Sequence, residues 1–281
     1  MKLQVYIPKG ALNHFVDSIT YLSGAGTGVA FQRMYQVIII NMGTNFHSSK
    51  VYMPQPEPWE QTSSIWINGK HEAPLMIENK GITAMYVIGV KHGMLPYLAN
   101  LPAIETSDLA VSAEHWTSKE IFHLRERLEE CDIDSGFLLI EDYFTKLVLK
   151  KDTHQLEKIQ WLSKAINSNT VNEICHTLGA TRKRLRNEAQ HYFGGSVKNL
   201  QGIIRFNSTL AEIAKNPDKS LSSLHEYYDQ SHFINDFKAR CGITPLQYKR
   251  LCKLYPGIKY TPNFIPVQKE TFLQFISSGD A

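Results

Sequence analysis

The chain has 281 residues, a length typical of two domains, and a formal net charge of +3. Residues 1–150 hold 12 Lys and Arg against 16 Asp and Glu, whereas residues 151–281 hold 18 against 11. The resulting +7 on the second part favours nucleic acid only slightly over an ordinary solvated surface. The four cysteines form no CxxC pair, which argues against a zinc site or a disulfide framework.

The first part of the chain shows no pattern typical of export or membrane insertion. The first ten residues lack the apolar stretch of a secretory signal, and the apolar run Val37–Ile40 is far too short to span a bilayer. We therefore expect a soluble protein in a reducing cytoplasm, with no membrane partner.

The first 150 residues alternate strand-like apolar runs with clusters of Gly, Pro, Asn and Ser, which predicts a β-rich domain. The expected strands are Leu3–Ile7, Met34–Met42, Ser64–Ile67, Leu75–Glu78 and Ile82–Val90. Helical periodicity follows over Ser118–Cys131 and Gly136–Leu149. The apolar faces of these two helices are wide enough to pack on the sheet or to form a seam between two copies. The polar joint at residues 150–153 predicts a domain boundary at residue 150.

No catalytic or metal-binding pattern stands out in this first part. The histidines His14, His47, His71 and His92 include no HxH pair, and no carboxylate lies at the offset of a cupin metal site. We expect them to be surface or hydrogen-bonded structural residues, with no metal and no cofactor. Residues 24–28 are rich in glycine but lack the Lys of a P-loop, and no GxSxG motif occurs, so we expect no enzyme.

Four aromatic residues could line a pocket for a sugar or another small organic molecule. They are Tyr52, Trp59, Trp66 and Tyr86. Aromatic side chains at strand spacing bury a large area in any β domain, so a core role is favoured by about three to one.

A helix-turn-helix pattern begins near residue 171. The first helix has an apolar face made of Val171, Ile174, Cys175 and Leu178. Gly179 can take the left-handed turn conformation, and Thr181 can cap the next helix. That helix turns Leu185, Ala189 and Phe193 inward. Its outer face carries the candidate DNA-binding residues Thr181, Arg182, Lys183, Arg186, Asn187 and Gln190. Cations and amides together suit phosphate contact and base readout.

A long helix over residues 198–215 is predicted next. Its inward residues are expected to be Leu200, Ile203, Ile204, Leu210 and Ala211. At 1.5 Å per residue this helix is roughly 27 Å long. That length is close to the ~34 Å between successive major-groove segments on one side of B-DNA.

A second helix-turn-helix pattern surrounds residue 230. Asp229 is a good N-cap, and the helix that it begins carries Phe233 and Phe237 on a face that must be buried. The candidate DNA-binding residues on this helix are Gln230, Ser231, Asn235 and Lys238. Amide and hydroxyl groups there can pair with base edges, and the lysine suits a phosphate. Gly242 ends the helix, and Pro245 begins the next one.

At these residues the chain resembles the AraC/XylS family of bacterial transcription regulators, whose DNA-binding domain has two helix-turn-helix units bridged by a linker helix. The resemblance spans about Leu156 to Arg250. It is strong in the second unit, at Tyr228 to Phe233, Phe237-Lys238, Gly242, Thr244-Pro245 and Tyr248. The first unit matches through Leu178-Gly179, Thr181, Leu185, Gly194, Ser196 and Arg205-Phe206. The chain departs from the family pattern at Ala189, Val197, Ser222 and Glu226.

The first part is similar to the cupin-like sensor domains of one branch of these regulators, through Gly81 to Lys91, His92-Gly93 and Leu95-Pro96. The resemblance implies an α+β protein with a sensor or dimerisation domain at 1–150 and a DNA-binding domain at 151–254. Residues 255–281 have three prolines followed by a short apolar patch, and we expect them to form a tail packed on the body. The resemblance also implies sequence-specific binding of double-stranded DNA, and it admits a small-molecule effector, RNA polymerase and a second copy of the chain as partners. The alternative is a catalytic or ligand-carrier β domain with a helical protein-interaction module.

Overall fold

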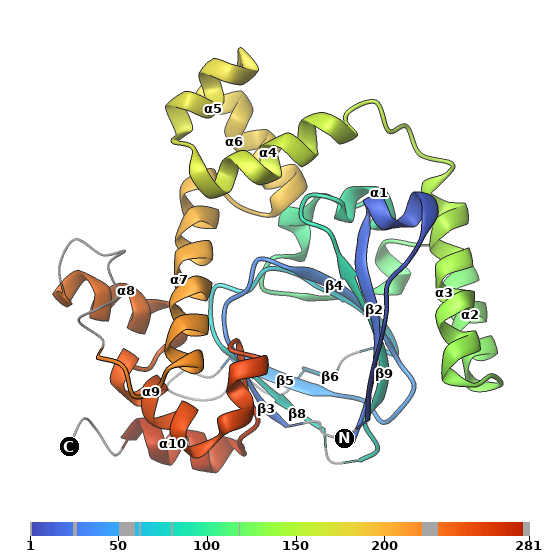
Figure 1. Ribbon diagram of the computed structural model, residues 1–281. Coiled ribbons are helices and arrows are strands. Elements are labelled where there is room, and N and C mark those ends of the chain that lie inside the picture. The colour runs from blue at the N-terminus through green and yellow to red at the C-terminus, as the bar shows by residue number, and fades with distance from the viewer. Residues whose placement is uncertain are drawn as a thin grey trace.

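The computed structural model describes residues 2–24, 27–50, 60–61, 63–79, 81–117, 119–220 and 230–277. It is a mixed α and β protein in which two antiparallel sheets come first and most of the helices follow (Figure 1). The predicted α+β class is therefore confirmed. No helix in these ranges is both long enough and apolar enough to pass through a bilayer.

The larger sheet has six strands in the order β1, β2, β9, β4, β7 and β10. Their bounds are Lys2–Tyr6, Val16–Ser23, Ala84–Val90, Gln36–Asn41, Ile65–Asn68 and Ala110–Ser112. The smaller sheet has the order β11, β3, β8, β5 and β6. Its strands are Phe264–Ile265, Gly28–Ala30, Leu75–Glu78, His47–Lys50 and Glu60–Gln61. All five predicted strands are confirmed with small shifts at their ends. Strands β2, β3, β5, β6, β10 and β11 were not predicted.

Strand β4 is buried along its whole length because both of its faces are covered. Val37 and Ile39 point toward the smaller sheet, where they join a small apolar cluster with Trp66. Ile38 and Ile40 lie on the other face, in the large core under the helices. Alternation of side chains along a strand accounts for this division.

The predicted aromatic pocket is not formed by the two of its residues that the structure describes. In the strand register Trp66 pairs with Ile39 and Tyr86 pairs with Ile40, so the two aromatic rings lie on opposite faces of the sheet. Each is buried in a different apolar cluster. Tyr52 and Trp59 lie outside the described residues. Trp66 and Tyr86 are core residues, as the favoured interpretation held.

Helices α1 (Leu95–Ala99), α2 (Glu120–Glu129) and α3 (Ile133–Val148) cover the outer face of the larger sheet. Helix α3 begins three residues before its predicted start, because the Asp132 carboxylate caps it by accepting the backbone N–H of Ser135 at 3.0 Å. The inner faces of α2 and α3 pack into the large core. Short 3-10 turns occupy Gly10–His14, Ala103–Thr106 and Ala113–His115.

The remaining helices form the second half of the chain. They are α4 (Leu156–Ser168), α5 (Val171–Leu178), α6 (Arg182–Phe193), α7 (Val197–Lys215), α8 (Gln230–Cys241), α9 (Pro245–Leu254) and α10 (Lys269–Ser277). Helices α4 to α6 share the large core with the larger sheet, whereas α8 and α9 share a second core with β3 and β8. The described residues thus pack closely across residue 150, and the division there stays a prediction.

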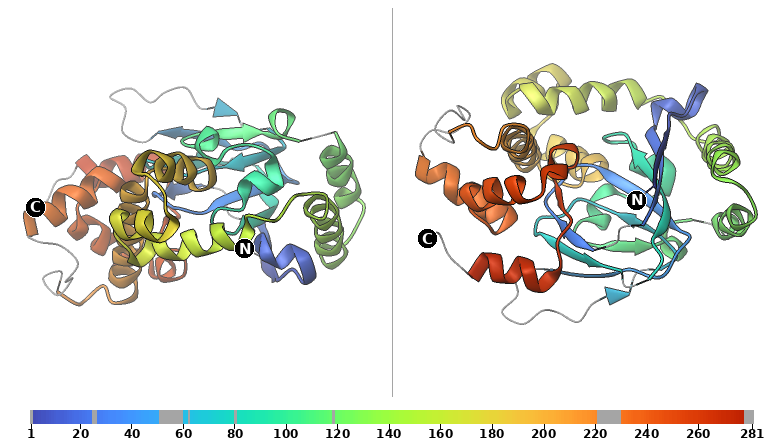
Figure 2. Two further views of the ribbon diagram at one scale, coloured as in Figure 1. Left: turned by 90° about the horizontal axis from the view of Figure 1, so that it is seen from above. Right: turned by 60° about the horizontal axis from the view of Figure 1, so that its bottom comes forward.

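The segment after α9 packs on the body of the protein, as expected. A 3-10 turn at Pro256–Tyr260 leads to β11, which pairs with β3 of the smaller sheet. Ile258, Ile265 and Phe272 are fully buried in the second core. Figure 2 shows α10 beside this sheet, next to α9.

Candidate nucleic-acid interface

The first helix-turn-helix unit is built from α5 and α6. Thr170 caps α5 in a reciprocal capping box with Glu173, and Gly179 ends the helix with a φ of 56°. Thr181 then caps α6, because its hydroxyl accepts the backbone N–H of Arg184 at 3.2 Å. The turn predicted at Gly179 and the cap predicted at Thr181 are both present.

The outer face of α6 carries the predicted cations. Arg182, Lys183, Arg186 and Asn187 are exposed, while Leu185, Ala189 and Phe193 are buried on the inner side. The Arg182 guanidinium donates to the Asn172 side-chain oxygen at 2.8 Å, which ties it to α5. Gln190 is partly buried. The structure therefore groups these residues on one surface, and their role in DNA binding stays a prediction.

Glu188 is the acidic residue on this helix, and two cations neutralise it. Lys158 of α4 donates to its carboxylate at 2.7 Å, and Arg184 donates at 3.2 Å. Arg184 is exposed and was absent from the sequence-based set. Arg184 lies four residues before Glu188, the spacing at which oppositely charged side chains pair on a helix. This spacing distinguishes Arg184 from Lys183 and Arg186, because the pairing with Glu188 occupies the Arg184 guanidinium.

Of the second unit the structure describes the candidate reading helix α8 and the helix α9 that follows it, while the turn expected before α8 lies outside the described residues. Phe233 and Phe237 are buried, and the Phe237 ring lies 5.3 Å from that of Phe206 on α7. Gly242 follows α8 with a φ of 74°, and Thr244 caps α9 in a capping box with Gln247. The predicted end at Gly242 and the predicted helix start at Pro245 are confirmed.

The outer face of α8 leaves Ser231, Asn235 and Lys238 exposed. Gln230 is the first residue of the helix, and its side chain lies outside the described part of the chain. The predicted cap Asp229, and the family positions Ser222, Glu226 and Tyr228, also lie outside the described residues.

Helix α7 connects the two units. Its 19 residues span about 28 Å, with α4 and α6 packed at its N-terminal half and α9 at its C-terminal half (Figure 1). The apolar side of α7 consists of Leu200, Ile203, Phe206, Leu210, Ile213 and Ala214. The expectation that Ala211 faces the core was wrong, since it is exposed one position beyond Leu210 on the helix.

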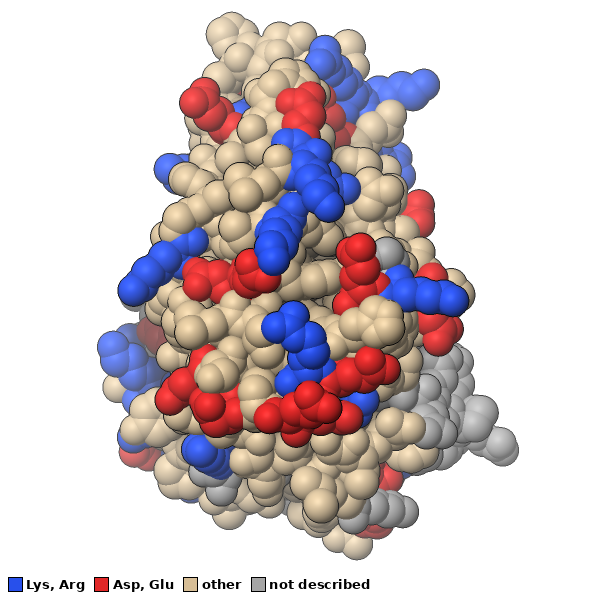
Figure 3. Space-filling view, turned by 90° about the vertical axis from the view of Figure 1, so that its right-hand side faces the viewer, with Lys and Arg blue, Asp and Glu red and all other residues tan. Residues whose placement is uncertain are grey.

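The face of the molecule over α2 and α3 differs from that of α6 and α8. Figure 3 shows acidic and basic side chains interspersed there, with several acidic residues grouped together. Many of these charges pair within their own helix, as Arg125 does with Glu129 and Lys146 does with Asp142. A surface with this mixture of charges is a poor match for a phosphate backbone.

A buried polar cluster lies where the loop after β7 approaches α7. The Lys70 side chain is 2% exposed, and its ammonium donates to the carboxylate of the more exposed Glu72 at 2.7 Å and to the Asn199 side-chain oxygen at 3.1 Å. His71 is 1% exposed, and neither of its ring nitrogens has a hydrogen-bond partner among the residues that the structure describes. Burial, together with the charges of Arg33 and Lys70, lowers the pKa of His71 to about 3.

His71 corrects the expectation that the histidines are surface or hydrogen-bonded residues. The sequence around it offered no signal for an unpaired, buried imidazole. Nor does any set of three His, Cys, Asp or Glu side chains come together to hold a metal within the described ranges.

Comparisons with known proteins give only a distant similarity. No family model matches the chain, and no curated protein matches it. Among solved structures it is similar to ToxT from Vibrio cholerae, with 16% identity, a TM-score of 0.43, and coverage of 89% of this chain and 98% of that chain. It is also similar to ToxT from Vibrio cholerae O395 bound to a methylnaphthalenyl butenoic acid, with 15% identity, a TM-score of 0.43, and coverage of 90% and 100%. Because these TM-scores are low, we infer the function from the residues and contacts of this chain.

Proposed function

We propose that this protein is a sequence-specific DNA-binding transcription regulator of the AraC/XylS type. In this proposal α6 and α8 enter two adjacent major-groove segments of one duplex. The exposed cations Lys183, Arg186 and Lys238 contact phosphates or guanine, and the amides Asn187 and Asn235 contact base edges.

One observation carries the proposal. The pair α5 and α6, joined by a turn at Gly179, and the pair α8 and α9, joined by a turn at Gly242, flank a single helix of about 28 Å. In each unit the aromatic and aliphatic residues are buried, and the polar residues of the candidate reading helix are exposed. The exposed polar faces support a polar partner, and the length of α7 supports a partner that repeats at about one duplex turn.

Selection of bound fragments from genomic DNA tests the proposal. Fragments that bind with nanomolar to micromolar affinity and share a common sequence support a regulator, and the binding should weaken steeply with salt. An interaction module attached to a catalytic or ligand-carrier domain would recover no common sequence. That result would reject the proposal.

We also propose that the regulator responds to a small anionic molecule bound near Arg33 and His71. Arg33 is partly buried, which lowers its pKa, and its guanidinium has no hydrogen bond or ion pair to any described residue. His71 lies close enough for that charge to act on it, and both of its ring nitrogens lack partners in the described ranges of the chain. Buried polar groups without partners in the protein are candidates for binding a ligand.

Thermal unfolding of the full chain with a series of carboxylates tests the effector. An anionic ligand that binds the folded state raises the melting temperature with concentration. The Arg33→Ala variant should lose this rise, whereas an Arg184→Ala variant, changed on the outer surface of α6, should keep it. An equal rise in both variants would show that the anion binds elsewhere.

A further inference from the structure

Arg240 lies near the end of α8, on the side away from the exposed residues of that helix. Its guanidinium Nε lies 3.1 Å from each carboxylate oxygen of Asp236, one turn earlier. Its Nη1 donates to the side-chain oxygen of Gln32 at 3.0 Å. Gln32 follows strand β3 and is 4% exposed. The second reading helix is therefore bonded to the β-rich region by one side chain.

Gly202 makes room for this bond. A Cβ atom at Gly202 would lie 2.3 Å from Arg240 Nη2, far inside contact distance. Gly202 is in the interior of α7, where glycine weakens a helix relative to alanine. The position therefore carries a residue that is poor for the helix, and the absence of a side chain there leaves the space that the Arg240 guanidinium occupies.

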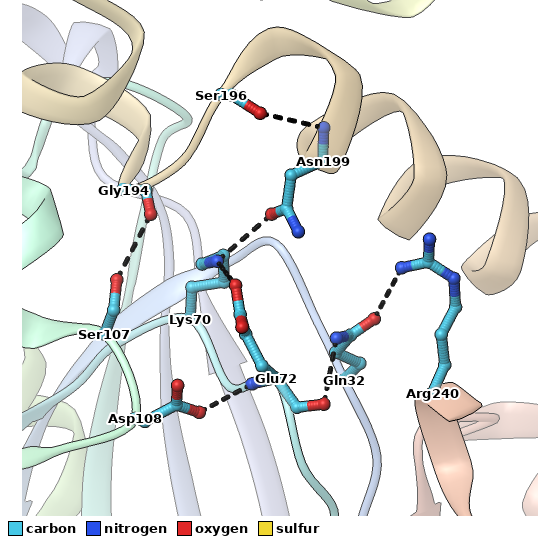
Figure 4. Close-up of polar contacts among 9 residues, drawn as sticks. All are labelled: Gln32, Lys70, Glu72, Ser107, Asp108, Gly194, Ser196, Asn199 and Arg240. Carbon is cyan, nitrogen blue, oxygen red and sulfur yellow. Dashed lines mark hydrogen bonds and ion pairs between the residues drawn. The ribbon is translucent and has the colours of Figure 1, made fainter. Parts of the chain in front are cut away.

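Gln32 is held firmly in place. Its side-chain nitrogen donates to the backbone oxygen of Glu72 at 3.1 Å, and its own backbone oxygen accepts from the Asn263 side chain at 2.9 Å. Figure 4 shows Gln32 between Glu72 and Arg240, with the Lys70 to Asn199 bond reaching the start of α7 beside it. The bonds to Arg240 and to Asn199 thus start from two loops of the β-rich part, after β3 and after β7, which are joined to each other by the bond from Gln32 to Glu72.

We propose that Arg240 is a positioning residue, which fixes the direction of α8 relative to α6 through its bond to Gln32. The proposal rests on the proposed DNA-binding function. Ser231, Asn235 and Lys238 are exposed while the Gln32 bond is formed. The bond therefore holds α8 with its reading face free, and it favours simultaneous binding by both helices. Preorganisation of this kind raises affinity by lowering the cost of ordering on binding.

The first test measures affinity for two DNA sites. One site holds both segments, and the other holds only the segment read by α8. The Gln32→Ala change lies in the β-rich region, yet it should weaken binding to the two-segment site by about tenfold, the usual scale for a hydrogen bond to a charged group. Binding to the single-segment site should not change. Gln268→Ala, at an exposed glutamine before α10, is the matched control and should leave both affinities unchanged.

An increase in two-segment affinity for Gln32→Ala would show that the bond blocks binding, and no change would show that it has no role. Either result overturns the proposal. The double variant Gln32→Ala with Arg240→Ala should bind no more weakly than Arg240→Ala alone, since both changes remove one bond. If the affinity losses of the two single variants add in the double variant, the proposal is also overturned.

Urea unfolding of Gly202 variants tests the contact without DNA. In the parent background Gly202→Ala should lower the unfolding midpoint, because the new methyl group displaces the guanidinium. In the Arg240→Ala background the same change should raise the midpoint, because alanine favours the helix. Equal effects in the two backgrounds would overturn the proposal. A chain that binds no DNA but shows this reversal would reject the proposed function and leave the contact established.

Discussion

Lowering the pH from 7.5 to 5.5 should destabilise the protein through His71. Its pKa is about 3 in the folded state, whereas an exposed histidine titrates near 6.5. The unfolded chain therefore binds a proton in this interval that the folded chain excludes, so stability falls as the pH drops below 6.5. At pH 5.5 the cost is about 1.4 kcal/mol, and at pH 7.5 it is nearly zero. This difference depends little on the folded pKa, because 3 lies far below 5.5.

The assay is urea unfolding of the parent and of the His71→Gln variant at both pH values. Other groups titrate in this range as well, so the quantity to compare is the difference in pH dependence between the two proteins. The parent should lose about 1.4 kcal/mol more than the variant. His176→Gln, at an exposed position on α5, is the control and should behave as the parent does. An identical pH dependence in the parent and His71→Gln would refute the burial of a neutral imidazole at residue 71.

Three further predictions concern the helical half. The double change Lys183→Gln with Arg186→Gln should lower the slope of log K against log salt for operator binding by roughly 1.8, measured by anisotropy titration. Arg184→Gln should change this slope much less, because Arg184 is paired with Glu188. Asn235→Ala should alter the preferred base at one position of selected sites, by about 1–3 kcal/mol, and unchanged preferences would remove it from the reading face. Phe237→Ala should cost about 3–5 kcal/mol in urea unfolding, because its ring is fully buried; a loss below 1 kcal/mol would contradict that packing.

Much of the helical half was predictable from the sequence because its signals are local. Thr181 and Thr244 occupy N-caps, and Gly179 and Gly242 take positive φ at the ends of helices. Such residues act over one helical turn, so their spacing reveals the helices without knowledge of distant contacts. The inward positions of α7 were less well predicted at Ala211, where helical spacing alone could not decide which of two adjacent residues is covered.

The rest depends on contacts between residues far apart in the sequence. Strand β2 combines Ile19 and Leu22 with several polar residues, and it becomes a strand by pairing between β1 and β9. Strand β11 has two residues and exists by pairing with β3. The bond of Arg240 to Gln32 joins positions separated by 208 residues. Periodicity contains no information about such partners, which is why neither this bond nor the burial of His71 was foreseen.

A footprint of the protein on a selected genomic fragment tests the central claim most directly. The account predicts two protected major-groove segments on one side of the duplex, separated by about one helical turn of 10 base pairs. Lys183→Gln with Arg186→Gln should weaken one segment, and Lys238→Gln should weaken the other. Protection of a single segment, or two segments that both respond equally to changes on α6, would contradict the placement of the two helices in adjacent grooves.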